Sequence, residues 1–238
     1  MEQYIPRINF EQNAGVVKLL EEINQKSIFK LCNDIEICLD YYKYDKIEIQ
    51  IDSPGGEISY LDFYLERLSI WKNKAQISTL VLSKASSAAA VISALGDIGN
   101  RFCYENSMML FHEAWLEKRS INKTSLKNLS KELEAIDNRI LNIIVGSAIE
   151  CYKYRIENDY GLQEYDLYDF PDKTLDELYN KLQHEIKKVS SIKNLKDIKS
   201  NKKLSNLFDI YSKLFALNTF IDPITAYNFY LIDEIKKY

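Results

Sequence analysis

Two spacings of apolar residues divide the chain into segments. Apolar and charged residues alternate at 46–52, KIEIQID, which is typical of a strand with one buried face. Apolar residues at steps of three and four, which share one face of a helix, occur at 57–73 and over the longer span 122–152. The short apolar run at 76–82, QISTLVL, predicts a strand covered on both faces.

The same reading extends to the rest of the chain. Further helices are predicted at 16–42 (one or two helices), 88–95, 173–188, 204–215 and 223–230. Further strands are predicted at 5–10, 102–104, 107–111 and 231–232. Because strands and helices alternate over the first half, we expect a layered α/β fold with right-handed crossovers.

Composition narrows the class of protein. A length of 238 residues accommodates one domain with an insertion or two small domains, and 46% hydrophobic with 28% charged residues is typical of a soluble globular chain. The net charge of −4 predicts no nucleic-acid surface. No apolar run is long enough for a membrane span, and the N-terminus does not resemble a signal peptide. We therefore expect a cytoplasmic protein that binds neither nucleic acid nor membrane.

The cysteines and histidines indicate no metal site. The four cysteines show no CxxC pairing, so they are expected to be buried thiols in a reducing compartment: Cys32, Cys38, Cys103 and Cys151. The two histidines have no zinc-ligand spacing. No metal or other cofactor is expected.

One stretch carries candidate chemistry. Ser86 and Ser87 open the small-residue helix at 88–95, and an apolar run, MMLF, ends on His112. A serine at a helix start followed by a histidine at the end of a buried strand resembles a nucleophile and its base. The structural alternatives are a helix N-cap for Ser87 and a core histidine for His112. His184 lies on a charged helix and is expected to be exposed.

The motif SPGG at 53–56 directly follows the first strand. Pro54 fixes one φ angle, and the two glycines permit a tight turn and a close backbone approach. A plain strand-to-helix turn explains the motif equally well.

Taken together, these segments resemble the proteolytic subunit of the Clp protease, a family of serine peptidases with the ClpP/crotonase fold. The resemblance lies in IEIQIDSPGG, in SKASSAAAVISALGDIGNRFCYENSMMLFH and in FIDPITAYNFYLIDEI, and it covers about 46–145 and 216–236. The ungapped series from Ser87 to His112 is its most specific part. The resemblance implies an α/β fold of repeated β-β-α layers with a long handle helix, here joined by a helical insertion.

The resemblance also implies a division of the chain. Residues 1–149 would form the core with its handle helix, 150–213 the helical insertion, and 214–238 the C-terminal part of the core. In the family the handle helix joins two heptameric rings, so an insertion after it is expected to affect assembly.

Carried over residue by residue, Ser87 would be the nucleophile and His112 the base. The N–H groups of Gly56 and Ala88 would form the oxyanion hole, with Ala88 at the positive end of a helix. Asn218 stands where the family has the third residue of the triad, an aspartate. Asn accepts a hydrogen bond from a histidine but does not offset the charge of an imidazolium. We therefore expect a weak or assembly-gated peptidase, with Asp222 as an alternative acid.

Three other functions stay open at this point. Lys84 with Ser87 would form a Ser-Lys dyad, a class that lacks the histidine of this motif. A second alternative is a catalytically silent subunit that assembles with an active paralogue or another partner. A third is a crotonase-fold enzyme acting on an acyl thioester, against which Ser87 argues. The resemblance further implies peptide or unfolded-protein substrates, a homo-oligomer that forms rings, and an AAA+ unfoldase or adaptor as partner.

Overall fold

The computed structural model describes residues 7–9, 14–114, 123–158, 170, 172–189 and 204–237. The chain divides into two compact units. The first comprises Met1–Leu110, Phe220–Tyr227 and Leu231–Tyr238, and the second Phe111–Thr219 and Asn228–Tyr230. The three-part division expected from the sequence stays a prediction.

The first unit is built on a mixed sheet. Eight strands pair among the described residues, in the order β1-β2-β3-β4-β5-β8, with β6 beside β4 and β7 beside β6. Their bounds are β1 Arg7–Asn9, β2 Ala14–Leu19, β3 Lys46–Ser53, β4 Gln76–Ser86, β5 Arg101–Tyr104, β6 Met108–Leu110, β7 Phe220–Ile221 and β8 Glu234–Lys236. The pairs from β2 to β5, β5 with β8, and β4 with β6 are parallel, whereas β1 and β7 pair antiparallel to their neighbours.

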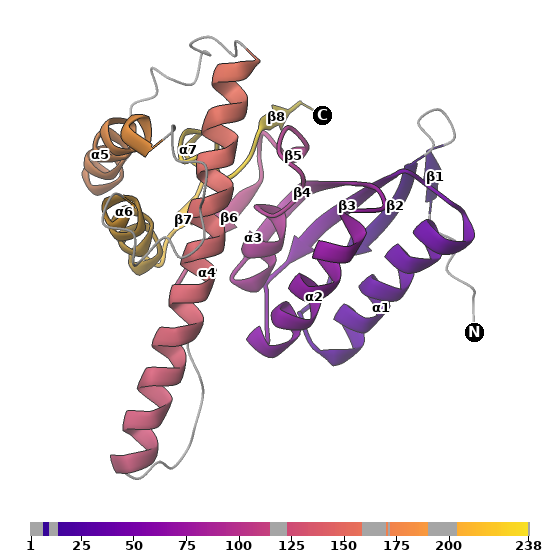
Figure 1. Cartoon of the computed structure of the whole chain (residues 1–238), viewed down its shortest axis with the longest axis horizontal. Helices are drawn as coiled ribbons and strands as arrows, with labels where there is room; N and C mark the ends of the chain where they lie inside the picture. Colours follow the sequence, from indigo (N-terminus) through magenta and orange to yellow (C-terminus); the bar gives the residue numbers. More distant parts are fainter. Residues whose placement is uncertain are drawn as a thin grey trace. The chain divides into compact units, whose positions relative to one another are not determined.

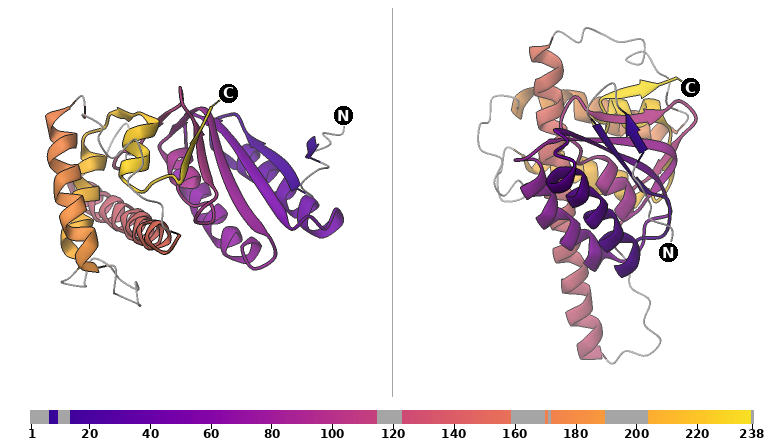
Figure 2. Two further views of the ribbon diagram at one scale, coloured as in Figure 1. Left: turned by 90° about the horizontal axis from the view of Figure 1, so that it is seen from above. Right: turned by 90° about the vertical axis from the view of Figure 1, so that its right-hand side faces the viewer.

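Helices connect the parallel strands. They are α1 Gln25–Glu36, which continues into a π-helical segment Ile37–Tyr41 (η1), α2 Ile58–Trp71, α3 Ala88–Ser93 and α7 Pro223–Asn228. Figure 1 shows α1 and α2 side by side over one face of the sheet, and the view from above in Figure 2 shows the strands curving over them. The alternating residues Ile47, Ile49 and Ile51 of β3 are fully buried. The predicted α/β fold is confirmed.

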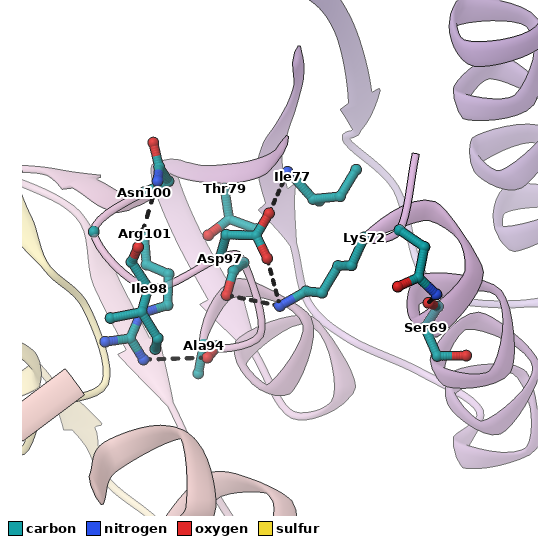
Figure 3. A network of polar contacts seen from close by, with 12 residues as sticks. Ser69, Lys72, Ile77, Thr79, Ala94, Asp97, Ile98, Asn100 and Arg101 are labelled. Atoms are coloured by element: carbon teal, nitrogen blue, oxygen red, sulfur yellow. Dashed lines mark hydrogen bonds and ion pairs between the residues drawn. The ribbon is translucent and has the colours of Figure 1, made fainter. Parts of the chain in front are cut away.

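A polar network holds the end of α3 against β4 and α2. Figure 3 shows Asp97 between Ile77 and Lys72. The Asp97 carboxylate accepts the N–H of Ile77 over 2.7 Å and pairs with Lys72 Nζ at 3.1 Å. The Asp97 N–H in turn donates to the Ile77 carbonyl over 2.7 Å. These bonds fix the turn that follows α3, the helix that begins directly after Ser87.

The predicted helix over 16–42 is wrong at its beginning. Residues Ala14–Leu19 form β2, which lies between β1 and β3, with Val17 opposite Ile49. Gly15 allows close packing here, since a Cβ at this position would lie 2.7 Å from Cys38 Sγ. The buried pair Val17 and Leu19 fits a strand as well as a helix, and pairing with β3 decides between them.

The C-terminal elements also differ from the prediction. The helix expected at 223–230 ends at Asn228, and the strand expected at 231–232 lies instead at Glu234–Lys236. β8 is placed by its parallel pairing with β5, where Phe102 faces Glu234. Such a tertiary partner is not visible in a local pattern. The other predicted strands and helices are confirmed within five residues at their ends, apart from the strand over 5–10, of which the described part is β1.

The second unit is helical in its described part. It contains α4 Lys123–Glu157, α5 Lys173–Val189 and α6 Ser205–Ala216, and α6 packs against both others. In the predicted apolar stripe of α4, Ile140 and Ile144 are buried, whereas Leu126 is 58% exposed. No helix in the described ranges is both long and apolar enough to cross a membrane.

Candidate active site

Ser87 occupies a sharp junction between strand and helix. β4 ends at Ser86, α3 begins at Ala88, and Ser87 between them has φ 55° and ψ −128°. A residue other than glycine seldom adopts a positive φ, and such strain costs about 1–3 kcal/mol. The Ser87 side chain makes no capping hydrogen bond to α3. The N-cap alternative therefore does not explain this residue, whereas a strained strand-to-helix turn is typical of a serine nucleophile.

The backbone around Ser87 holds this turn in place. The Ser87 N–H donates to the carbonyl of Leu110 over 2.7 Å, and the Ser87 carbonyl accepts the N–H of Val91 at 3.2 Å. Leu110 is the last residue of β6, and His112 follows two residues later. The strand that leads to the histidine is thus bound to the serine itself.

The glycine loop packs directly on the serine turn. Gly55 has φ +86°, and a Cβ there would lie 2.4 Å from the Ser86 carbonyl oxygen and 2.6 Å from Ser87 Cβ. Gly56 has φ +151°, and its Cβ would lie 2.1 Å from the carbonyl oxygen of Ile23. No side chain fits either contact. SPGG is therefore more than a strand-to-helix turn, because its glycines let two backbone segments touch.

Two backbone donors are left open at this corner. Within the described part of the chain, neither the N–H of Gly56 nor that of Ala88 has a hydrogen-bond acceptor. The Ala88 nitrogen lies 3.2 Å from where a Cβ of Gly55 would stand, so the helix start and the glycine loop are in contact. Ala88 is the first residue of α3, whose leading N–H groups have no partner within the helix. These two donors are suited to bind an anionic oxygen.

His112 belongs to the second unit and is only half-buried, so it is not a core histidine. Its Nδ1 lies 2.6 Å from the carbonyl oxygen of Glu113. A carbonyl only accepts hydrogen bonds, so Nδ1 carries the proton and Nε2 is left as the acceptor. This is the tautomer that a general base needs. The preceding residue, Phe111, is buried and stacks on Phe215 of α6 with ring centroids 5.2 Å apart.

Asn218 follows the C-terminal end of α6. It has φ 48°, its side chain is exposed, and its N–H donates to the Phe215 carbonyl at 3.1 Å. A left-handed asparagine at this position is a common helix ending. Among the described residues, no hydrogen bond joins Asn218 to His112. Asp222, the alternative acid, accepts the N–H of Thr225 over 2.7 Å at the start of α7.

The second histidine and the four cysteines show the exposure expected from the sequence. His184 is 72% exposed on α5, as expected. All four cysteines are buried and free, as expected, and burial raises the pKa of Cys32 and of Cys103 to about 12. In the described ranges, no three potential metal ligands among His, Cys, Asp and Glu lie together.

Comparison with known proteins assigns the family. A model of the Clp protease family matches residues 8–166, which contain both Ser87 and His112. The chain belongs to the Clp protease family. The match covers β1 to α4, the part of the chain that carries the glycine loop and the serine turn.

Curated members of the Clp protease family are similar at modest identity. The chain is 30% identical over 116 residues to ATP-dependent Clp protease proteolytic subunit 2 of Frankia casuarinae, covering 48% of this chain and 52% of that protein. It is 28% identical over 143 residues to proteolytic subunit 1 of Cutibacterium acnes, covering 56% and 65%. It is 37% identical over 79 residues to the proteolytic subunit of Carsonella ruddii, covering 32% and 38%. The chain thus spans less than two thirds of the length of each of these relatives.

Two features of the site were not visible in the sequence. The Ser87 N–H donates to the main-chain carbonyl of Leu110. Every residue has such a carbonyl, so the sequence does not indicate which one accepts this bond. The carboxylate of Asp137 binds the N–H of Ala114 at 2.7 Å, two residues after His112. Asp137 lies beside the apolar stripe of the long helix, four residues after Leu133 and three before Ile140, but this spacing does not show what its carboxylate binds.

Proposed function

We propose that this chain is a Clp-type serine peptidase in which Ser87 is the nucleophile and His112 the base. The observation that carries the proposal is the strained turn at Ser87, whose N–H is bonded to Leu110 two residues before His112. The packing of Gly55 on this turn, with open N–H groups on Gly56 and Ala88, supports it further.

In the proposed reaction, Ser87 Oγ attacks the carbonyl carbon of a peptide bond. His112 Nε2 takes the Oγ proton and gives it to the leaving amine, which leaves an ester between the acyl group and Ser87. A water molecule, activated by the same histidine, then hydrolyses this ester. The N–H groups of Gly56 and Ala88 stabilise the oxyanion in both steps, and loss of one such donor typically costs about 2.7–4 kcal/mol.

We propose that Asn218 stands at the position of the third triad residue, although in this structure the Nδ1–H of His112 is bonded to the Glu113 carbonyl. An asparagine carbonyl orients a histidine but contributes no negative charge to stabilise the imidazolium. We therefore expect slow hydrolysis, or hydrolysis that depends on assembly.

The relatives are named as ATP-dependent proteolytic subunits. We accordingly propose a cytoplasmic homo-oligomer, forming rings, that receives unfolded protein from an AAA+ unfoldase or adaptor. The second candidate is a silent subunit that assembles with an active paralogue. The specific observation in its favour is the position of Asn218, which has an alternative role as the ending of α6.

Labelling by a fluorophosphonate probe tests the proposal, since the probe reacts with an activated serine. We expect labelling of the wild-type chain, its loss in Ser87→Ala, and its retention in Ser83→Ala, an exposed serine of the same strand. Absence of labelling, both in the purified oligomer and after mixing with a Clp ATPase, would favour the silent subunit. Native mass spectrometry measures the number of subunits.

A further inference from the structure

We propose that Asp137 of α4 is a positioning residue for His112, and that it supplies the negative charge which Asn218 lacks. This inference rests on the proposed peptidase function, because it assigns a role in that site. Both residues lie in the second unit, so the arrangement does not depend on how the two units are placed.

The first observation is a direct bond to the segment that carries the histidine. The N–H of Ala114 donates to Asp137 Oδ1 over 2.7 Å, and both residues are half-buried. The chain from His112 to Ala114 is thereby tied to α4. The sequence separation between the two bonded residues is 23, so the contact belongs to the tertiary fold rather than to a local turn.

The second observation is electrostatic. Burial is the largest effect on the Asp137 carboxyl and raises its pKa. The hydrogen bond from Ala114 lowers this pKa, the nearby charge of Glu113 raises it, and the charge of His112 lowers it. The interaction is reciprocal, so a charged Asp137 stabilises a positively charged imidazole. Because the pKa of Asp137 is raised, this carboxylate becomes neutral at a higher pH than an exposed aspartate does, and its support of the imidazolium is lost as the pH falls through that value.

In a Ser-His-Asp triad one aspartate both orients the histidine and stabilises its positive charge. Here we assign these two functions to two groups, the Glu113 carbonyl and the Asp137 carboxylate. The Glu113 carbonyl holds the Nδ1–H of His112 at 2.6 Å and so selects the tautomer. It carries no full charge. Asp137 carries the charge and fixes the backbone that presents the ring. The arrangement keeps both functions of the acid without a hydrogen bond between His112 and a carboxylate.

The described side chains that line the cavity at Asp137 include no Lys or Arg that would neutralise its charge. Asp137 lines a cavity of about 490 Å³ with Glu113, Glu134, Leu129 and Phe215, among others. The carboxylates at this cavity, in the described part of the chain, are those of Glu113, Glu134 and Asp137, and no Lys or Arg side chain lines it. Of the three, the Asp137 carboxylate binds the backbone beside His112. We therefore expect that removal of the Asp137 carboxylate, more than of the other two, changes the position and charge stabilisation of His112.

Two substitutions separate charge from structure. Asp137→Asn removes the charge, yet its amide oxygen still accepts the Ala114 N–H, whereas Asp137→Ala removes both. Glu134→Gln is the matched control, because it removes an exposed carboxylate of the same helix and cavity. We expect kcat/KM to fall roughly tenfold or more in Asp137→Asn and further in Asp137→Ala, with little change in Glu134→Gln.

The pH at which His112 titrates is the decisive measurement and does not require activity. The chain has two histidines, so a His184→Gln background leaves one imidazole signal to follow by NMR. In Asp137→Asn we expect that titration, and with it the acid limb of the kcat/KM profile, to move to lower pH. Glu134→Gln should leave both in place.

An unmoved titration in Asp137→Asn would overturn the inference, even where activity or melting temperature falls, because a purely structural residue gives that result. If the wild-type chain is labelled at Ser87 and the titration does not move, the peptidase proposal stands and this inference fails. If the titration moves but no condition gives labelling, the electrostatic link stands and the peptidase proposal fails.

Discussion

Arg101 and Asp233 form a buried ion pair with two parallel hydrogen bonds. The Arg101 Nη2 lies 2.6 Å from Asp233 Oδ1 and the Arg101 Nε 2.8 Å from Oδ2, with side-chain exposures of 0% and 6%. The same carboxylate accepts the N–H groups of Gly99 and Arg101. The pair ties the residue before β8 to β5, and so joins the end of the chain to the unit that carries Ser87.

Breaking this pair should destabilise the first unit strongly. In Asp233→Ala the Arg101 guanidinium stays buried without its counter-charge, for which we expect a loss of about 3–5 kcal/mol in the free energy of unfolding. Urea unfolding followed by circular dichroism measures it. Glu234→Gln, at the exposed neighbouring residue, should change the free energy by less than about 0.5 kcal/mol. A loss in Asp233→Ala no larger than this control would show that the pair is not needed.

Gly55→Ala should abolish labelling at Ser87. The added Cβ would stand 2.4 Å from the Ser86 carbonyl oxygen, and the φ of +86° is strained for alanine, so the loop must withdraw from the serine turn. We expect a destabilisation of at least about 1–3 kcal/mol together with the loss of labelling. In contrast, Gly146→Ala within α4 should keep labelling, because alanine favours a helix. Full labelling of Gly55→Ala would argue against a role of this contact in the site.

Asn218→Asp tests the third position of the triad. If Asn218 supports His112, a carboxylate there adds charge stabilisation and should raise the rate of peptide hydrolysis at least tenfold, since the reverse change in a serine protease lowers the rate by about 10⁴. Asn218→Gly is the informative control, because glycine keeps the φ of 48° that ends α6 while it removes the side chain. Equal rates in all three proteins would leave Asn218 with its helix-ending role alone.

The buried thiols should resist alkylation in the folded chain. Burial raises the pKa of Cys38 to about 11 and that of Cys103 to about 12, from an ordinary value of 9.0, so at pH 8 very little reactive thiolate is present. We expect iodoacetamide to modify the four cysteines only after denaturation, as measured by intact-mass spectrometry. Rapid modification of the native protein at pH 8 would contradict this burial.

The same shifts imply a dependence of stability on pH. Above about pH 9 the unfolded chain loses thiol protons that the folded chain retains, so the unfolded state binds fewer protons and the free energy of unfolding falls as the pH rises toward 11. Replacement of Cys103 by alanine should weaken this decline. A stability that is flat between pH 8 and 11 would not agree with it.

The local spacing of apolar residues was sufficient to predict β3, α2 and α4. The alternation in β3 and the apolar steps along α2 and α4 predicted these elements because each places its apolar side chains on one face, whatever packs against it. The positions of Ser87 and His112 at a helix start and a strand end suggested a nucleophile and its base, and the resemblance strengthened that hypothesis. The family match agrees with the resemblance, while the pairing itself stays a prediction.

Contacts between distant parts of the chain decided the features that the local spacing of residues does not determine. β2 became a strand because β3 offered a partner, and β8 lies where β5 pairs with it. The positive φ of Ser87 follows from contacts with Gly55 and Leu110, both distant in sequence. The position of Asp137 beside the apolar stripe of α4 did not show that its carboxylate binds the N–H of Ala114. In each case the deciding energy comes from a partner far along the chain, which the spacing of neighbouring residues does not encode.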